Sequence, residues 1–471
     1  MVVQHNMQAM NANRMLNITT GAQSKSTEKL SSGYRINRAA DDAAGLTISE
    51  KMRKQIRGLD QASTNAQDGV SSVQTAEGAL TEVHSMLQRM NELAVQAANG
   101  TNSKESDRQA IQDEIDQLTT EIDRVSETTK FNETYLLKGE AGTKLINMKA
   151  HDAGLKGSLT DNGDGTATFK MDTLNAGDKI SIGGKQYTIG STADQAKALY
   201  NGVKVDGTET VTINGKEYKV QDTNPSADKG EISKTELDKL VKGGVTVEYK
   251  GKSATVITDD AQKGGVAADG VDDLDPSIIT DKKAYELASK ELLAANQIGD
   301  TENCAKVTVG GTTDAVTLAN ATNEFTINVG QAKVANSLAF SLHVGADADM
   351  TNKIQVNIDS MDSASLGIKG LNVKDDSGKS ATYAVDAIAD AVAKVSSQRS
   401  ALGAVQNRLE HTIDNLDNVV ENTTSAESRI RDTDMAEEMV NYSKNNILAQ
   451  AGQSMLAQAN QSTQGVLSLL Q

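Results

Sequence analysis

The sequence predicts a mainly α-helical protein with an α+β insert. Both ends should form one long antiparallel helical rod of coiled-coil type, and a sheet-rich region should separate them. Long stretches at each end keep apolar residues at spacings of three and four, without proline. Arginine is absent between Arg124 and Arg399, and both prolines, Pro225 and Pro276, fall in that interval. The interval also contains alternating segments and hairpin turns, which are typical of β-strands.

The longest helical stretch runs from Ala43 to about Asn99. Its apolar residues keep an almost seven-residue repeat, which indicates a coiled-coil seam. A helix of about 55 residues spans roughly 80 Å. Turn-forming residues at 99–102 end it. A second amphipathic helix over 106–126 is expected to fold back antiparallel to it.

The C-terminal end repeats this pattern, with an apolar stripe over 385–422 and then a final helix. From Asn445 to Gln471 no residue is charged, in a chain of net charge −17. The first forty residues are also poor in charge, and Glu28 is their only acid. Uncharged amphipathic ends need a partner to cover them, which favours assembly over catalysis. We predict that the assembly contacts are Val3, Met7, Met10, Leu448, Met455, Leu456, Val466, Leu467 and Leu470.

The middle of the chain predicts an α+β insert. Strands 179–182 and 186–189 flank Gly183 and Gly184, and strands 211–213 and 217–220 flank an Asn214-Gly215 turn. A further strand is expected at 245–249. Short helices are expected at 193–200, 234–241 and 282–296.

Composition excludes several functions. The acidic balance, with a pI near 4.9, argues against a nucleic-acid partner. No stretch approaches the 18 apolar residues of a membrane span. A single cysteine, Cys304, allows no intrachain disulfide, and the first residues show no standard secretory signal. These facts alone would suggest the cytoplasm.

No catalytic, cofactor-binding or metal-binding residue is predicted. The five histidines are scattered, and no HExxH, Walker A or GxSxG motif occurs. The acidic loop from Asp161 to Thr166 superficially resembles the start of an EF-hand. It has a misplaced glycine, and Asp172 stands where the loop's last glutamate belongs, so a polar β-turn is the favoured interpretation.

Several motifs resemble bacterial flagellins, in the same order and at both ends of the chain. The likeness covers about 1–140 and 338–471, and the insert does not share it. The motifs are VVQHN at 2–6, EKLSSGYRINRAADDAAGL at 28–46, LQRMNELAVQA at 87–97, IQDEI at 111–115, SLGI at 365–368, LGAVQNRL at 402–409, SRIRDTD at 428–434 and QGVLSLL at 464–470.

This resemblance implies an extracellular subunit that polymerises with itself into the flagellar filament. It implies a terminal coiled-coil domain of 1–42 and 430–471, whose outermost segments order on assembly. A helical rod domain of 43–150 and 338–429 would include a small β-hairpin region near 340–373. The insert, 151–337, would be a variable, surface-exposed outer region.

The resemblance also implies partners. Export would use the type III export apparatus and a flagellar export chaperone, which explains the missing signal. Hook-associated junction and cap proteins would contact the filament ends. Toll-like receptor 5 would recognise the rod, and the matching positions are Gln88, Arg89, Leu93, Ile111 and Glu114. Some flagellins have arginine where this chain has Asn91.

Three alternatives remain open on the sequence. A hook-associated junction protein or filament-end protein would share the terminal helices. An enzymatic insert would be a second alternative, although the zinc-protease motif is absent. A glycan-binding or mucin-binding insert over 151–337 would be a third.

Overall fold

The computed structural model describes residues 6–100, 106–222, 230–259, 269–375 and 378–469, without the side chains of 463 and 465–469. The chain forms two compact units. The first comprises Met1–Ser72, Ser341–Val356 and Ala404–Gln471, and the second comprises Val73–Phe340 and Asn357–Gly403.

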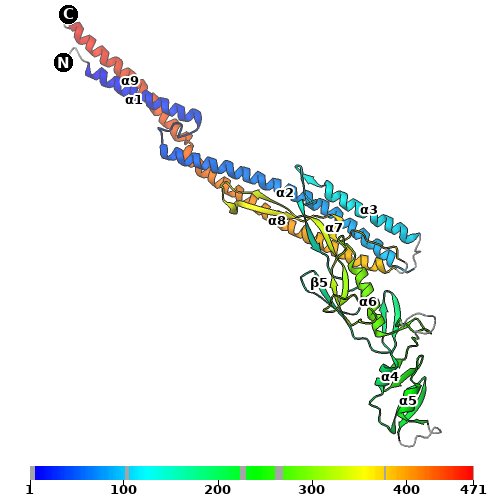
Figure 1. The fold of residues 1–471 in the computed structure, drawn as a ribbon. Coiled ribbons are helices and arrows are strands. Elements are labelled where there is room, and N and C mark those ends of the chain that lie inside the picture. Colours follow the sequence, from blue (N-terminus) through cyan, green and yellow to red (C-terminus); the bar gives the residue numbers. More distant parts are fainter. Residues whose placement is uncertain (1–5, 101–105, 223–229, 260–268, 376–377, 470–471) are drawn as a thin grey trace. The chain divides into compact units, whose positions relative to one another are not determined.

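Helices dominate both ends of the chain (Figure 1). They are α1 (Met7–Ser32), α2 (Ala43–Ala98), α3 (Asp107–Thr128), α4 (Ala193–Leu199), α5 (Lys234–Leu240), α6 (Asp281–Asn296), α7 (Ser363–Leu366), α8 (Lys379–Arg431) and α9 (Met435–Leu469), with a 3-10 turn at Met350–Asn352.

Strands occupy the middle of the chain and the segment before α7. They are β1 (Lys130–Phe131), β2 (Thr134–Tyr135), β3 (Glu140–Asn147), β4 (Gly157–Asp161), β5 (Thr166–Met171), β6 (Lys179–Ile182), β7 (Lys185–Ile189), β8 (Asp206–Ile213), β9 (Lys216–Gln221), β10 (Glu231–Ile232), β11 (Thr246–Tyr249), β12 (Lys252–Thr255), β13 (Ile278–Ile279), β14 (Lys306–Val309), β15 (Glu324–Asn328), β16 (Gln331–Asn336), β17 (Leu338–His343) and β18 (Lys353–Ile358).

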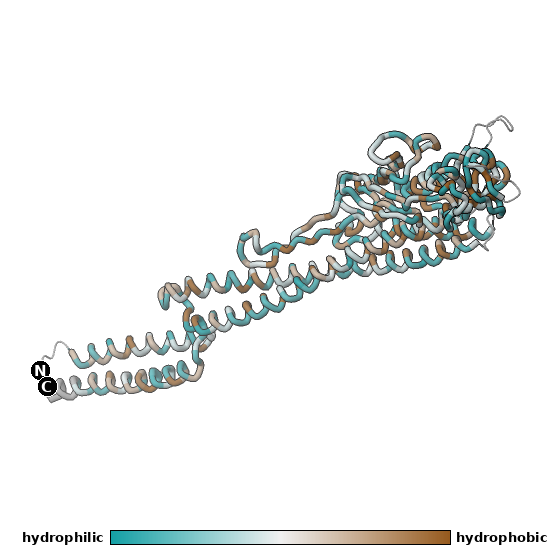
Figure 2. Tube along the Cα trace, turned by 90° about the horizontal axis from the view of Figure 1, so that it is seen from below, coloured by the Kyte–Doolittle hydropathy of each residue, from teal (hydrophilic) through white to brown (hydrophobic). Residues whose placement is uncertain are grey.

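In the first unit, α1 and α9 run antiparallel and lie side by side in both views of the backbone (Figures 1 and 2). The side chain of Asn6 accepts a hydrogen bond from the Ala9 amide and so caps the start of α1. Gly33 ends the helix with φ of 76°, a left-handed conformation that glycine adopts without strain.

Helices α2 and α8 also pair antiparallel. In the first unit Ser63 donates to Asp417, and in the second unit Arg399 binds Glu77 at 2.7 Å. The seam between them is built from alanine and aliphatic residues, so the two backbones can approach closely. The seam residues that are fully buried on α2 include Ala62, Ala66, Val73, Ala76, Leu80, Val83, Leu87, Met90 and Ala94.

Helix α3 lies beside α2 (Figure 1), and an ion pair between Arg89 and Glu114 joins the two helices. Its residues Ile111, Ile115 and Ile122 are all buried. Gln112 fixes the segment before α8, because its amide donates to the Leu371 carbonyl and accepts from the Val373 amide, both at 2.8 Å. The Gln112 side chain thus supplies the hydrogen bonds that a neighbouring strand would otherwise give to this stretch of backbone.

The insert contains three sheets, of strand orders β10-β9-β8-β11-β12, β13-β7-β6 and β14-β15-β5-β4, while β16 pairs with β3 at its base. The β6–β7 turn consists of Gly183 and Gly184, with φ of 56° and 73°. The β8–β9 turn consists of Asn214 and Gly215, also with positive φ. Both are the left-handed turns that match the twist of a hairpin.

Two separate hydrophobic cores hold the insert. One packs α6 on the sheets of β5 and β7, and it stacks Phe169 and Phe325 at 6.3 Å between ring centroids. The other packs α4 and α5 on the five-stranded sheet around Tyr200. The chain has only four phenylalanines, and two of them lie in this one core. The helical rod is therefore packed mainly with aliphatic side chains.

The predicted elements are present, with small changes in extent. The stripe expected at 385–422 belongs to a longer helix, α8, and the expected hairpin region contains the two-stranded sheet of β17 and β18. The acidic loop at Asp161 is a turn between β4 and β5, in which Asn162 donates to the Thr166 carbonyl. The three-domain boundaries stay a prediction.

The α2 seam generates a stability prediction. Leu87 is fully buried, so Leu87→Ala should lower the free energy of unfolding by about 2–5 kcal/mol, as buried leucine truncations do. Val95 lies on the same helix and is 54% exposed, so Val95→Ala should change it by less than about 0.5 kcal/mol. Urea unfolding followed by far-UV circular dichroism measures the free energy of unfolding of both variants. Equal losses of stability in the two variants would contradict the assignment of Leu87 to the buried seam.

Glu209 generates a pH prediction. A hydrogen bond from the Tyr249 hydroxyl, then the Lys204 amide and Lys250, lowers the pKa of Glu209 to about 2. A lowered folded pKa adds stability that is complete above the unfolded value of 4.5 and disappears as pH falls toward 2.

Glu209→Gln should therefore reduce stability at neutral pH and flatten its fall between those two values, measured by tyrosine fluorescence in an acid titration. The control is Glu217→Gln, on the adjacent strand, whose side chain is exposed. Parallel acid profiles for Glu209→Gln and the parent would refute this assignment.

Candidate assembly surface

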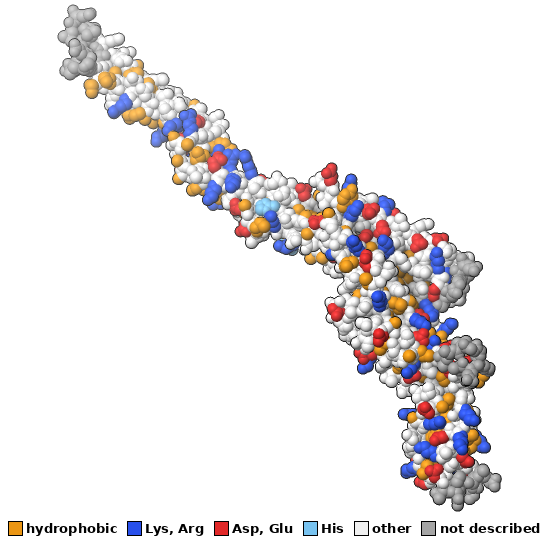
Figure 3. Space-filling model, in the orientation of Figure 1, with side chains coloured by type: hydrophobic (Ala, Val, Ile, Leu, Met, Phe, Trp, Pro, Cys, Tyr) orange, Lys and Arg blue, Asp and Glu red, His pale blue; other side chains and the backbone are white. Residues whose placement is uncertain are grey.

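Helices α1 and α9 leave most of their large apolar side chains uncovered. Met7, Val440 and Ile447 are each about two-thirds exposed or more, at 70%, 68% and 67%. Figure 3 shows such side chains, in orange, spread over the surface of these two helices. The other exposed members of this set are Met10, Met15, Ile18, Met435, Met439, Leu448 and Met455. We call these residues the terminal apolar face.

Few polar contacts hold the two helices together. The Asn6 amide donates to the Ala459 carbonyl at 3.1 Å, and Lys29 lies 3.7 Å from Glu438. Ser26 is the only buried residue of α1, at 5% exposed, and the described side chains of α9 include one buried residue, Ala449, at 8%. The pair therefore buries little apolar surface of its own.

The connections to the next helices pair with each other. Tyr34 and Asp432 form an isolated antiparallel bridge, and the Thr433 amide donates to the Gly33 carbonyl. The Arg431 guanidinium lies over the Tyr34 ring at 4.9 Å from its centroid, and it binds Glu50 at 2.9 Å. The two chain segments that lead to α1 and α9 are thereby held together.

Two shallow grooves lie on these helices. One of about 520 Å³ runs along α9 and is lined by Met439, Val440, Ser443, Lys444, Ile447 and Leu448. The other, of about 460 Å³, lies on α1 and is more polar, because its lining is Met10, Asn13, Arg14, Asn17 and Ile18. Each groove is formed by one helix alone, which is the shape that another helix can fill.

The structure gives the exposure of five of the predicted assembly residues, and their role in assembly stays a prediction. Met7, Met10, Leu448 and Met455 are exposed, whereas Leu456 is half-buried. Val3 and Leu470 lie outside the described residues, and so do the side chains of Val466 and Leu467.

The predicted receptor residues separate into two groups. Arg89 of α2 binds Glu114 of α3 at 2.9 Å and Glu92 at 3.1 Å, and hydrogen bonding to Glu114 raises the pKa of the Arg89 guanidinium. Gln88 is exposed beside it and contacts His84. These side chains form a charged, accessible patch that spans two helices.

Leu93 and Ile111, in contrast, point into the rod. They are 2% and 6% exposed, so neither offers an apolar side chain at the surface in this structure. The signal was present in the sequence, because Leu93 follows Met90 by three residues and precedes Ala97 by four, which are seam spacings.

Sequence reasoning missed the Arg431 contacts, because nothing in the local sequence links Arg431 to Tyr34 and Glu50, nearly four hundred residues away. Within the described ranges, no helix is both long and apolar enough to cross a membrane. Nor, in that part of the chain, do three or more His, Cys, Asp or Glu side chains come together as a metal site.

Comparison with known proteins gives a consistent result. Residues 3–141 match the bacterial flagellin N-terminal helical region, and residues 385–470 match the bacterial flagellin C-terminal helical region. Flagellin of Clostridium tyrobutyricum is 39% identical over 98% of this chain and 100% of its own length. Flagellin of Bacillus subtilis (strain 168) is 36% identical over 100% of both. A solved structure of FliC from Burkholderia pseudomallei matches at 20% identity over 72% of this chain and 99% of that one, with a TM-score of 0.25.

Proposed function

Because this chain belongs to the bacterial flagellin family, we propose that the terminal apolar face is where its copies contact one another. Flagellins are the structural subunits of the extracellular flagellar filament, so this protein polymerises and is not an enzyme. The relatives are flagellins matched along their whole length, and this sets aside the junction-protein and enzyme alternatives.

One observation carries the proposal: α1 and α9 are long helices with no sizeable core of their own. Burying one exposed methionine or isoleucine contributes about 1.5–3 kcal/mol. Ten such side chains are exposed on this pair, so neighbouring copies that cover them would supply a large driving force. The absence of charge beyond Lys444 removes the repulsion and desolvation that would oppose close packing.

We expect that Ile447→Ser combined with Met455→Ser prevents polymerisation. Both side chains are exposed in the single chain, so the monomer should keep its fold and its melting temperature. Seeded polymerisation followed by light scattering and electron microscopy should show at least a tenfold rise in the critical concentration, which is about 1.4 kcal/mol or more per added subunit.

The matched control is Leu274→Ser, which removes a side chain of similar exposure, 69%, from the insert. It should polymerise like the parent. If the double variant forms filaments as fast as the parent, the terminal apolar face is not the contact surface.

The proposal extends to recognition by Toll-like receptor 5 through Gln88, Arg89 and Glu114. What supports it is the family resemblance of 87–97 and 111–115, and the exposure of a planar, permanently charged guanidinium between two helices. Leu93 and Ile111 would then act by shaping the backbone under this patch, since their side chains are buried.

Arg89→Ala should weaken receptor binding by monomeric protein at least tenfold, because it removes the central charged donor. Leu93→Ala should weaken it as well, together with a loss of thermal stability. Surface plasmon resonance with the receptor ectodomain measures both. Arg124→Ala, which removes an exposed arginine of α3 paired with Glu121, is the control. Unchanged affinity in Arg89→Ala and Leu93→Ala would rule the site out.

We also propose the remaining partners that the resemblance implies. The export chaperone and type III export apparatus would handle the chain before assembly, and the junction and cap proteins would bind the same terminal helices. We further propose the division into a terminal domain (1–42 and 430–471), a rod domain (43–150 and 338–429) and an outer domain (151–337).

A further inference from the structure

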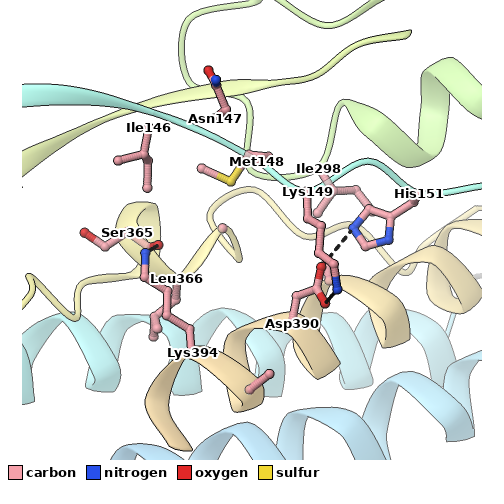
Figure 4. A pocket seen from close by; sticks show the side chains of 13 residues that line it. Ile146, Asn147, Met148, Lys149, His151, Ile298, Ser365, Leu366, Asp390 and Lys394 are labelled. Carbon is pink, nitrogen blue, oxygen red and sulfur yellow. Dashed lines mark hydrogen bonds and ion pairs between the residues drawn. The ribbon is translucent and has the colours of Figure 1, made fainter. Parts of the chain in front are cut away.

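Charged side chains at the base of the insert pair with groups of the same copy. They line a cavity of about 260 Å³ between the chain that leaves β3, helix α7 and one face of α8. Figure 4 shows Asp390 facing Lys149 and His151, at distances of 2.9 and 3.7 Å. Lys394 donates to the Ser365 carbonyl at 2.6 Å. Because each of these charged groups has a partner in its own copy, none is left to pair with another molecule.

The first unit differs, because two stretches of its long helices each carry an excess of one charge. Residues 43–57 of α2 have four basic side chains and one acid, in a chain of net charge −17. Residues 409–428 of α8 have five acids and no lysine or arginine. The Ser49 hydroxyl of α2 donates to Glu427 of α8 at 2.8 Å. A basic stretch of one helix therefore lies beside an acidic stretch of the other.

The basic side chains of α2 point away from α8. Arg57 precedes Ala66 by nine residues, or two and a half turns, so the two side chains lie on opposite sides of α2. Ala66 is fully buried in the seam. Arg53 and Lys54 lie about one turn before Arg57 and share its side of the helix. We call Arg53, Lys54 and Arg57 the basic face.

Acids of the same copy do not neutralise the basic face. Lys54 and Arg57 are exposed, and neither has an ion pair within the described residues. Arg53 lies 3.5 Å from Glu50, but Glu50 also binds Arg431 at 2.9 Å. One carboxylate thus serves two guanidinium groups, and the face keeps a net positive charge.

The acids of α8 form a row on one face of that helix, because they are spaced by four, three and four residues. This acidic row consists of four exposed side chains, Glu410, Asp414, Asp417 and Glu421. Among the residues that the structure describes, none of the four pairs with a basic side chain. Leu409, which packs with Ala66, directly precedes Glu410, so the row lies about 100° around α8 from this buried contact.

The two faces cannot meet within one copy, because one lies on the far side of α2 and the other on the flank of α8. They can meet between two copies that lie side by side in the same direction. Such a contact joins two different surfaces, so it leaves one of each free and does not close on itself. A single exposed ion pair contributes little, but several aligned charges steer association and fix its register.

We propose that the basic face of one copy docks on the acidic row of a neighbouring copy. This inference rests on the proposed function, because it requires a polymer, but it uses a surface separate from the terminal apolar face. The apolar side chains would drive association, whereas the charged faces would select neighbours in the correct orientation. The row extends over about 16 Å of helix, so the basic side chains can be matched along it.

A charge reversal tests the contact. Lys54→Glu with Arg57→Glu, the reversed variant, should raise the critical concentration for seeded polymerisation at least tenfold at about 0.1 M salt, since like charges would then face each other. Both side chains are exposed, so its melting temperature should stay near that of the parent. At about 1 M salt, where the Debye length is about 3 Å, its critical concentration should approach that of the parent.

A charge exchange is the sharper experiment. Adding Asp414→Lys and Glu421→Lys to the reversed variant exchanges charges between the two faces and restores the net charge of the parent. This exchanged variant should polymerise at a critical concentration about fivefold or more below that of the reversed variant, because opposite charges again face each other.

The matched control is Lys179→Glu with Lys185→Glu, which changes the net charge equally through two exposed side chains of the insert. It should polymerise like the parent. Parent-like polymerisation of the reversed variant, no recovery in the exchanged variant, or an equal loss in the control would each overturn the charged contact. If only Ile447→Ser with Met455→Ser loses polymerisation, the charged contact fails and the terminal apolar face stands.

Discussion

The rest of the structure depends on the aliphatic seam between α2 and α8. These helices come from opposite ends of the chain, and they share one antiparallel contact made of alanine, valine, leucine and methionine. The chain has no tryptophan and four phenylalanines, so few large side chains are available to fill a wide core. The helix backbones instead approach each other closely, and small side chains fill the space between them. The Glu77–Arg399 pair and the Ser63–Asp417 bond lie beside the seam. They set the register of the two helices more than they add to stability.

Helices α1 and α9 also pair with each other, but they cover only part of their apolar side chains. Their sequence has helical spacing, yet side chains such as Met7, Val440 and Ile447 remain in solvent. The linker contacts of Tyr34 with Arg431 and Asp432 hold the two helices in one place without burying their faces. A stable rod and an incompletely covered terminal pair thus suit a subunit that exists first as a monomer and then associates with other copies. On the proposal made above, the terminal segments would gain most of their apolar burial from neighbouring copies.

Much of this fold could be predicted from local signals. Helix α2 follows from its seven-residue repeat, and the β6–β7 and β8–β9 hairpins follow from Gly183-Gly184 and Asn214-Gly215, because those turns are encoded by adjacent residues. It was harder to predict which apolar side chains face the core and which face solvent. Leu93 belongs to the same repeat as Met90 and is buried, although the family motif suggested a surface role.

The pairing of the terminal helices was predicted, but individual side-chain contacts between distant segments were not predictable from one sequence. Arg431 with Tyr34, Gln112 with the 371–373 backbone, and Asn296 with the backbone of His151 all join residues more than a hundred positions apart. No periodicity carries that information. The cavity beside Ser365 is of the same kind, since its walls come from three separate segments.

The most direct measurement is amide hydrogen exchange of α1 and α9 in the monomer and in the assembled filament, with α2 as the internal reference. If neighbouring copies complete the terminal helices, their amides should exchange far faster than the α2 seam in the monomer and approach its protection in the filament. Terminal helices as well protected in the monomer as in the filament would show that they are stable alone, and would contradict the account.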